Sequence, residues 1–167
     1  MTQLLPEGES FQSTLIAAPP GAGKTTLLRE MVAALSNGSE ERAPLRVGIV
    51  DERGELAGMY RGVPQLDVGF HTDVLDSCPK TLGIPMLMRS ANPQVIAVDE
   101  ITTAEDLTAM AAAANCGVAL LATIHALDEE ELRRKPLYPV LAASQVFRRL
   151  ITISVEAGQR RYQVRPL

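Results

Sequence analysis

The chain has 167 residues, and its 16 basic and 20 acidic side chains give a formal net charge of −4. Hydrophobic residues make up 46% of the sequence and charged residues 22%, values that are ordinary for one globular domain and exclude collagen, a coiled coil and intrinsic disorder. No apolar run approaches the ~18–20 residues of a membrane-spanning helix, and the acidic balance lends no support to nucleic-acid binding.

Short apolar strands alternate with helical segments along the chain. The first strand ends at Pro19-Pro20-Gly21, and the helix after it has a wide apolar face and a stop signal at Asn37-Gly38. A later helix begins at Thr102-x-x-Glu105, which resembles a capping box. The predicted strands cover 11–18, 45–50, 95–98 and 118–124, and the predicted helices cover 23–35, 79–90 and 102–115. This alternation predicts an α/β fold with a mainly parallel sheet covered by helices on both faces.

The segment 51–77 and the C-terminal part of the chain have weaker patterns. Residues 51–77 are rich in glycine and charge, so we expect a long irregular segment of the kind that often carries function. One or two short helices follow the last buried strand, and alternating residues on both sides of Ala157-Gly158 predict an antiparallel hairpin. We therefore expect one domain over 1–167, with residues 1–10 flexible.

Cysteines and paired arginines give further expectations. Cys78 and Cys116 lie far apart without the spacing of a metal site, which predicts reduced thiols in a cytosolic protein. The local basic pairs Arg148-Arg149 and Arg160-Arg161 are expected on solvated faces of the molecule.

The strongest motif is APPGAGKT at 18–25, which fits a phosphate-binding loop with alanine in the first glycine position. Gly21 and Gly23 allow the torsions that let backbone N–H groups curl around phosphate oxygens. Lys24 is predicted to reach the β- and γ-phosphates, and the Thr25 hydroxyl to bind Mg²⁺. The alternative is a glycine-rich turn that matches by chance. The residues predicted to bind the nucleotide here are Pro20, Gly21, Ala22, Gly23, Lys24, Thr25 and Thr26.

The second motif is VIAVDE at 95–100, a buried strand that ends in two acids. Asp99 is predicted to hold Mg²⁺ through water, and Glu100 to orient and polarise the attacking water. Two acids after a strand are usually loop residues, but together with a phosphate loop they form the second half of a nucleotide hydrolase. The glutamate favours a hydrolase over P-loop kinases and small GTPases.

Two further strand ends carry candidate residues. Thr123 is predicted to sense the γ-phosphate or position water, with His125 just beyond it, provided that their strand lies between the first strand and the strand at 95–98. The alternative is a strand-end threonine and a histidine that caps a loop. The acids Asp51, Glu52 and Glu55 follow the second strand, where they line either the ligand crevice or a solvated turn.

In this order, the phosphate loop, the acidic segment, the Asp-Glu strand end and the Thr-x-His sequence resemble the hexameric ATPases of type II and type IV secretion systems. The closer resemblance is to the sporulation stage III AA family. It covers nearly the whole chain and is clearest at 18–29, 47–58, 72–80 and 86–101, with weaker agreement at 118–125 and 147–158. The resemblance implies a three-layer, RecA-like P-loop NTPase of the ASCE type, with a parallel central sheet and a C-terminal antiparallel hairpin.

The resemblance also implies roles for single residues. Glu52 would belong to an acidic box and His125 to a histidine box, and Arg89 could reach a phosphate at a subunit boundary. For Arg89 the alternative is that an arginine in a last helical turn interacts with the helix dipole. The implied catalytic residues are Lys24, Glu52, Glu100, Thr123 and His125, and the implied metal ligands are Thr25 and Asp99.

Some positions depart from the family pattern. Thr102-Thr103 stands where glycine is expected, His71 where arginine is typical, and Ala126 where glycine is expected. Family members carry an N-terminal domain beside a neighbour's nucleotide site, and we expect that domain to be absent because only 17 residues precede Ala18.

The function implied by the resemblance is ATP binding and hydrolysis with Mg²⁺ as cofactor, slow in the isolated domain. ATP turnover would be coupled to assembly or transport through a membrane channel. The implied partners are further copies in a ring of six and the channel proteins of a sporulation or secretion complex. No nucleic acid is expected, and the protein would be cytoplasmic, at the inner face of the membrane complex. The alternative is an ATP-dependent assembly scaffold with little hydrolysis, and a small-molecule kinase is a third, weaker reading.

Overall fold

The computed structural model of the chain describes residues 10–156 and 158–167, so residues 1–9 of the stretch predicted to be flexible lie outside it. The strands are β1 (Thr14–Ala18), β2 (Val47–Asp51), β3 (Met59–Tyr60), β4 (Val63–Pro64), β5 (Thr72–Asp76), β6 (Val95–Val98), β7 (Ala119–His125), β8 (Arg149–Glu156) and β9 (Gln159–Pro166). The helices are α1 (Lys24–Asn37), α2 (Lys80–Ser90), α3 (Ala104–Asn115), α4 (Glu129–Arg134) and α5 (Tyr138–Ser144).

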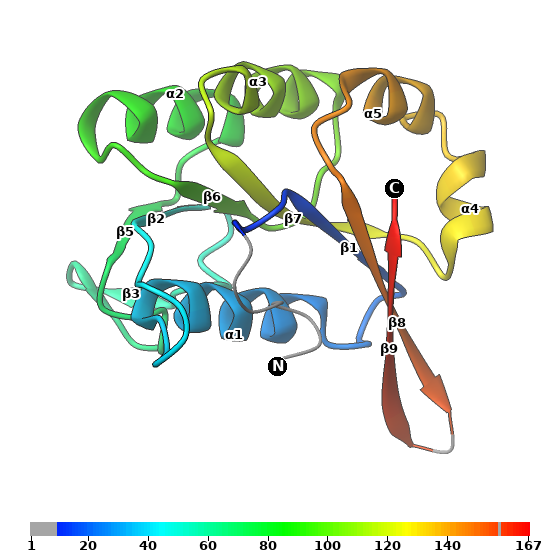
Figure 1. Ribbon diagram of the computed structural model, residues 1–167, viewed down its shortest axis with the longest axis horizontal. Coiled ribbons are helices and arrows are strands. Elements are labelled where there is room, and N and C mark those ends of the chain that lie inside the picture. Colours follow the sequence, from blue (N-terminus) through cyan, green and yellow to red (C-terminus); the bar gives the residue numbers. More distant parts are fainter. Residues whose placement is uncertain (1–9, 157) are drawn as a thin grey trace.

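One sheet of seven strands forms the middle of the molecule, in the order β5-β2-β6-β7-β1-β8-β9 (Figure 1). All pairings are parallel except the last, in which β9 returns antiparallel to β8. A separate two-stranded sheet joins β3 and β4. The prediction of a mainly parallel α/β sheet with a C-terminal antiparallel hairpin is confirmed.

Helices cover both faces of the sheet, and the side chains of the strands alternate between two hydrophobic cores. In β1, Ile16 and Ala18 pack with the apolar face of α1, whereas Leu15 and Ala17 pack with α2, α3 and α5. Figure 1 shows α1 on one side of the sheet and α2, α3 and α5 on the opposite side. Because both faces are covered, the central strands read as continuous apolar runs, which is why they could be predicted.

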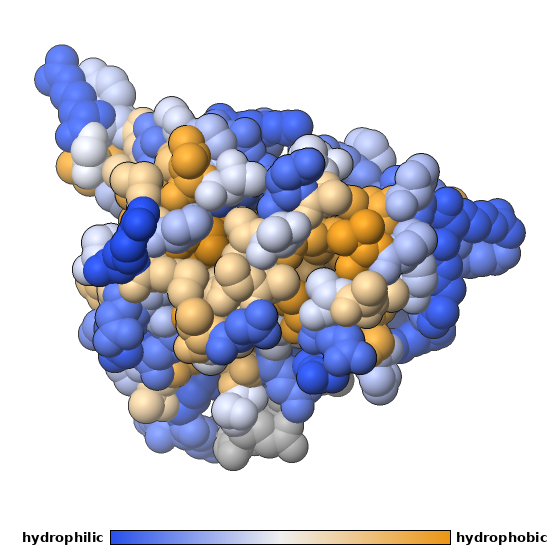
Figure 2. All heavy atoms as spheres, turned by 90° about the horizontal axis from the view of Figure 1, so that it is seen from above, coloured by the Kyte–Doolittle hydropathy of each residue, from blue (hydrophilic) through white to orange (hydrophobic). Residues whose placement is uncertain are grey.

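The outer surface over α2, α3 and α5 mixes apolar and polar side chains, as Figure 2 shows. Its exposed large apolar side chains include Leu82 and Met86, one turn apart on α2, and Val140 on α5. Within residues 10–156 and 158–167, none of the helices combines the length and apolar character needed to cross a membrane.

The sequence predicted an irregular conformation for the segment 51–77, but this segment contains the edge strand β5. This strand pairs in parallel with β2, from Val47 opposite Thr72 to Asp51 opposite Asp76. Its residues are only half-buried or exposed. An edge strand with one partner therefore lacks the apolar run that marks the central strands.

The capping box of α3 lies one residue later than predicted. Thr103, not Thr102, is the N-cap, and its hydroxyl accepts a hydrogen bond from the backbone N–H of Asp106 at 3.2 Å. The Asp106 carboxylate accepts bonds from the backbone N–H groups of Thr102 and Thr103. The side chain of aspartate is long enough to close the box, so Glu105 is not used.

Candidate active site

Three neighbouring parallel strands bring the predicted motifs to one edge of the sheet. β7 pairs on one side with β1, where Ala18 lies opposite His125, and on the other side with β6, where Val98 lies opposite Ala122. The phosphate loop follows β1 and the Asp-Glu pair follows β6, so both emerge at the carboxyl edge, where ligands bind in such sheets. This is the strand order on which the prediction for Thr123 depended.

A cavity of about 380 Å³ opens at this edge. It is lined by Pro20, Gly21, Gly23, Lys24, Thr25, Thr26, Arg53, Glu55, Asp99, Glu100, His125 and Arg160. The structure thus brings most of the predicted site residues together. It places Ala22, Glu52, Arg89 and Thr123, which are all described, outside the lining of the cavity.

The phosphate loop has the backbone conformation that its glycines allow. Gly21 and Gly23 have φ angles of 75° and 97°, in the left-handed region that favours glycine. Ala22 is buried beneath the loop, and its N–H donates to the carbonyl of Pro19 at 3.3 Å. Helix α1 starts directly after Gly23, and neither a side-chain cap nor an acidic residue occupies the N–H groups of its first turn. Its first N–H groups are therefore available to an anion.

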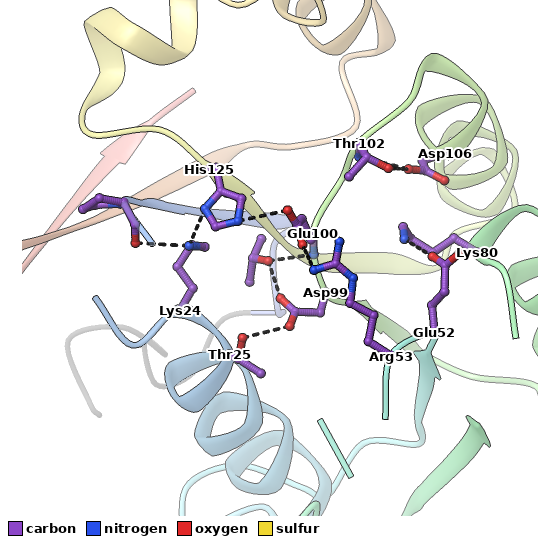
Figure 3. A network of polar contacts seen from close by, with 12 residues as sticks. Lys24, Thr25, Glu52, Arg53, Lys80, Asp99, Glu100, Thr102, Asp106 and His125 are labelled. Carbon is purple, nitrogen blue, oxygen red and sulfur yellow. Dashed lines mark hydrogen bonds and ion pairs between the residues drawn. The ribbon is translucent and has the colours of Figure 1, made fainter. Parts of the chain in front are cut away.

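Lys24 and Glu100 are connected through His125 (Figure 3). Lys24 is 7% exposed, and its ammonium group donates to the carbonyl of Pro19 at 3.2 Å and to Nδ1 of His125 at 2.8 Å. Because an ammonium group can only donate, Nδ1 accepts, and Nε2 holds the proton that it donates to Oε1 of Glu100 at 2.9 Å. Burial lowers the pKa of Lys24, and the negative charges of Asp99 and Glu100 oppose this shift.

Asp99 is held from two sides by hydroxyl groups. The Thr25 hydroxyl donates to its Oδ2 at 2.8 Å, and the Thr123 hydroxyl donates to its Oδ1 at 2.5 Å. Thr123 is fully buried, so it positions Asp99 from below and does not face the cavity. The contact with a γ-phosphate or water that the sequence predicted for Thr123 stays a prediction; its hydroxyl contacts Asp99 and the backbone N–H of Glu100, which both follow β6.

Glu100 has an unusual backbone conformation. Its φ of 58° lies in the left-handed region, which residues other than glycine rarely adopt. Two hydrogen bonds hold it there: the N–H of Glu100 donates to the Thr123 hydroxyl at 2.8 Å, and the N–H of Ile101 donates to the Thr123 carbonyl at 2.8 Å. The Glu100 carboxylate forms an ion pair with Arg53 and accepts a hydrogen bond from Nε2 of His125. The acid is thus aimed into the cavity by its own strand end and by a neighbouring strand.

The donor atoms of this site fit a magnesium ion. The Thr25 hydroxyl and the Asp99 carboxylate supply the oxygen ligands that Mg²⁺ prefers, and phosphates and water usually supply the rest. In the part of the chain that the structure describes, no group of three or more His, Cys, Asp or Glu side chains could hold a metal alone. The two protein oxygens of Thr25 and Asp99 would leave further ligand positions for water and phosphate oxygens.

The acids at the end of β2 and just after it have different surroundings. Asp51 is 1% exposed, and its carboxylate accepts hydrogen bonds from the backbone N–H groups of Glu55, Leu56 and Ala57. It is therefore a structural residue that shapes the loop. Glu55 lines the cavity.

Glu52, predicted to be catalytic, points away from the cavity and forms an ion pair with Lys80, as Figure 3 shows. Lys80 is only 5% exposed at the start of α2, so this carboxylate compensates a nearly buried charge. The structure thus assigns Glu52 a local electrostatic role, and a catalytic role for it stays a prediction.

Arg89 lies in the last turn of α2 and is exposed. Helix α2 leads into the start of β6, so Arg89 lies toward the amino edge of the sheet, opposite the cavity. It does not reach the phosphate loop of its own chain. A contact with a neighbouring subunit's nucleotide stays a prediction.

Two cavity residues were not predicted from the sequence. Arg53 lies among acids in a segment that was expected to be irregular. In the sequence, its position just after a strand was the one feature that could have indicated a place in the cavity. Arg160 is exposed, as expected, but it also lines the cavity from β9, which was not predicted. Its signal was weak because the register of a hairpin cannot be read from alternating residues alone.

Comparison with known proteins identifies relatives over most of the chain. The family described as "Sporulation stage III, protein AA" matches residues 1–164. Stage III sporulation protein AA of Bacillus subtilis (strain 168) is 41% identical over 149 residues, which are 89% of this chain and 48% of the relative. The chain thus spans about half the length of this relative.

Solved structures show the same fold. The Legionella pneumophila ATPase DotB superposes with a TM-score of 0.67 at 18% identity, over 96% of this chain and 46% of DotB. The VirB11 ATPase from the Brucella suis type IV secretion system, in complex with sulphate, gives a TM-score of 0.64 at 15% identity, over 93% of this chain and 48% of VirB11. The RecA-like fold that the sequence resemblance implied is confirmed.

Proposed function

The chain belongs to the sporulation stage III protein AA family, and from this premise we propose that it binds and hydrolyses ATP as a subunit of a sporulation machine. One observation carries the proposal. Lys24, the Thr25–Asp99 pair and Glu100 follow the ends of two strands, β1 and β6, and converge on a single cavity beside a phosphate loop. These are the groups that phosphoryl transfer to water needs at one place.

Each of these groups has a step to perform. The N–H groups of the phosphate loop and the Lys24 ammonium bind the phosphates of ATP, while Thr25 and Asp99 hold the magnesium ion. Bound Mg²⁺ neutralises charge on the phosphate oxygens. Glu100 accepts a proton from water as the water oxygen bonds to the γ-phosphorus and the bond to the bridging oxygen of ADP breaks. His125 keeps Glu100 and Lys24 in a fixed relation through its two ring nitrogens.

The contacts of the Glu100 carboxylate with other side chains favour a second candidate function. Arg53 and His125 both contact its carboxylate, which occupies acceptor sites that a water would need. A protein that keeps these contacts after nucleotide binding would bind ATP but hydrolyse little of it. Such a protein would act as a nucleotide-dependent assembly scaffold.

Replacement of Lys24 by alanine tests nucleotide binding. We expect Lys24→Ala to weaken Mg-ATP binding by about 100-fold, because two charge-assisted hydrogen bonds are lost. Binding is measured by calorimetry with a non-hydrolysable ATP analogue. Lys135→Ala, which removes the same charge at the end of α4, is expected to leave the affinity unchanged. Equal affinity of Lys24→Ala and the wild-type protein would contradict the proposed site.

We further propose that the subunits assemble into a ring of six at the cytoplasmic face of a membrane channel. The support is the fold shared with an ATPase of a type IV secretion system and the sporulation family of the chain. In a ring, a neighbouring subunit can place a positive group at the nucleotide, which contributes ~10³–10⁵ in turnover.

Ring assembly makes ATPase activity depend on protein concentration. We expect the rate per subunit to rise steeply as the concentration passes from the monomeric to the assembled range, because each site is completed by its neighbour. Steady-state phosphate release is measured together with the mass of the assembly. A rate per subunit that is high and constant down to monomeric solutions would contradict the ring.

A further inference from the structure

The C-terminal hairpin extends past the end of the strand that carries the phosphate loop. β8 pairs with β1 only from Arg149 opposite Thr14 to Thr152 opposite Ala17, yet it continues to residue 156. β9 returns along this extension, with Arg160 opposite Val155. Figure 1 shows the hairpin projecting beyond the sheet, on the side of α1. Arg160 therefore lies beyond the carboxyl end of β1, beside the loop that follows it.

The guanidinium group of Arg160 packs against the phosphate loop. A Cβ atom added to Gly23 would lie 2.9 Å from Cζ of Arg160 and 3.0 Å from its Nη2. The positive φ of Gly23 is what favours glycine there, and the short distances show that the Arg160 guanidinium lies directly beside the loop. Arg160 also lines the cavity.

The electrostatic surroundings of Arg160 favour an anion beside it. The start of α1 carries the positive end of the helix dipole, and the Lys24 ammonium lies at the same place. Among the described residues, no ion pair joins Arg160 to a carboxylate. Asp99 and Glu100 are bound by other side chains, which leaves Glu55 as the remaining acid of the cavity. Lys24 has the negative charges of Asp99 and Glu100 beside it, whereas no ion pair of the described residues compensates Arg160. An anion between Arg160 and the start of α1 would therefore be attracted by both.

We propose that Arg160 is a nucleotide-binding residue that donates hydrogen bonds to the α- or β-phosphate of the bound nucleotide, within the same subunit. The order of the sheet indicates which phosphates it contacts. The acids that mark the γ-phosphate and metal end follow β6, two strands to one side of β1, whereas Arg160 lies on β9, two strands to the other side. Arg160 therefore faces the phosphates that remain in ADP. This inference rests on the proposed nucleotide site.

The test compares Arg160→Gln with Arg161→Gln, which removes the same charge from the next residue on the opposite face of β9. Arg160→Gln is expected to weaken Mg-ATP and Mg-ADP binding by about tenfold each, and Arg161→Gln to leave both unchanged. Arg160→Lys, which keeps the charge but not the planar fork, is expected to lie between Arg160→Gln and the wild-type protein. Thermal unfolding of each variant confirms that the fold is kept.

A third probe separates phosphate binding from stacking on the base. Mg-tripolyphosphate has no base, and we expect Arg160→Gln to weaken its binding by a factor similar to that for ATP. Unchanged affinity for ATP and ADP, a loss for ATP alone, or a loss that spares tripolyphosphate would each overturn the proposal. A wild-type protein that binds no nucleotide would instead contradict the proposed function, so the two failures are distinguishable.

Discussion

Glu100→Gln is expected to reduce the rate of ATP hydrolysis by at least about 100-fold while leaving the affinity for Mg-ATP nearly unchanged. The amide keeps the size of the side chain and an oxygen that can accept from Nε2 of His125, but it cannot take a proton from water. General-base catalysis typically contributes ~10²–10⁴ in rate. The rate is measured in single turnovers with saturating ATP, and the affinity by calorimetry.

The same experiment decides between hydrolysis and scaffolding. Glu105→Gln is the matched control, because it makes the same chemical change on the exposed surface of α3 and is expected to leave the rate unaltered. A wild-type protein that binds ATP without measurable turnover would support the scaffold. A Glu100→Gln protein with the wild-type rate would show that another group activates the water.

Asp51→Ala is expected to lower the free energy of unfolding by about 3 kcal/mol. The carboxylate of Asp51 accepts backbone N–H groups at 3.0, 3.1 and 2.9 Å, and two of these bonds are buried. Removing it leaves buried donors without partners, each of which costs ~1–3 kcal/mol. Asp73→Ala, at an exposed position of β5, is expected to change the stability by less than about 0.5 kcal/mol.

Urea unfolding followed by circular dichroism measures both Asp51→Ala and its control. A loss below about 1 kcal/mol for Asp51→Ala would contradict the structural role of this carboxylate. The prediction also connects stability to the site, since the loop that Asp51 holds carries Arg53 and Glu55 into the cavity.

The parts of the fold that could be predicted from the sequence are those with strong local signals. β1, β2, β6 and β7 are buried on both sides, so their apolar runs were visible. The phosphate loop and the Asp99-Glu100 pair depend on residue types that backbone geometry and metal chemistry require at fixed positions. Their convergence then follows from the parallel connection of neighbouring strands.

The parts that could not be predicted depend on contacts between distant segments. β5 is an edge strand whose residues are half-buried or exposed, and only its pairing with β2 defines it. The directions of Glu52 and Arg53 follow from their partners Lys80 and Glu100, which come from other elements. Arg160 reaches the cavity because of the hairpin register, which a shift of one residue would reverse.

The left-handed backbone conformation of Glu100 lowers the stability of the fold. A residue with a side chain in this region typically loses about 1 kcal/mol, and glycine would avoid that loss. Replacing Glu100 by glycine would therefore favour the stability of the fold but remove the acid that the proposed hydrolysis needs. Screening for thermostability alone would favour glycine here and discard the acid, so a search for stabilised variants would have to measure ATP hydrolysis as well.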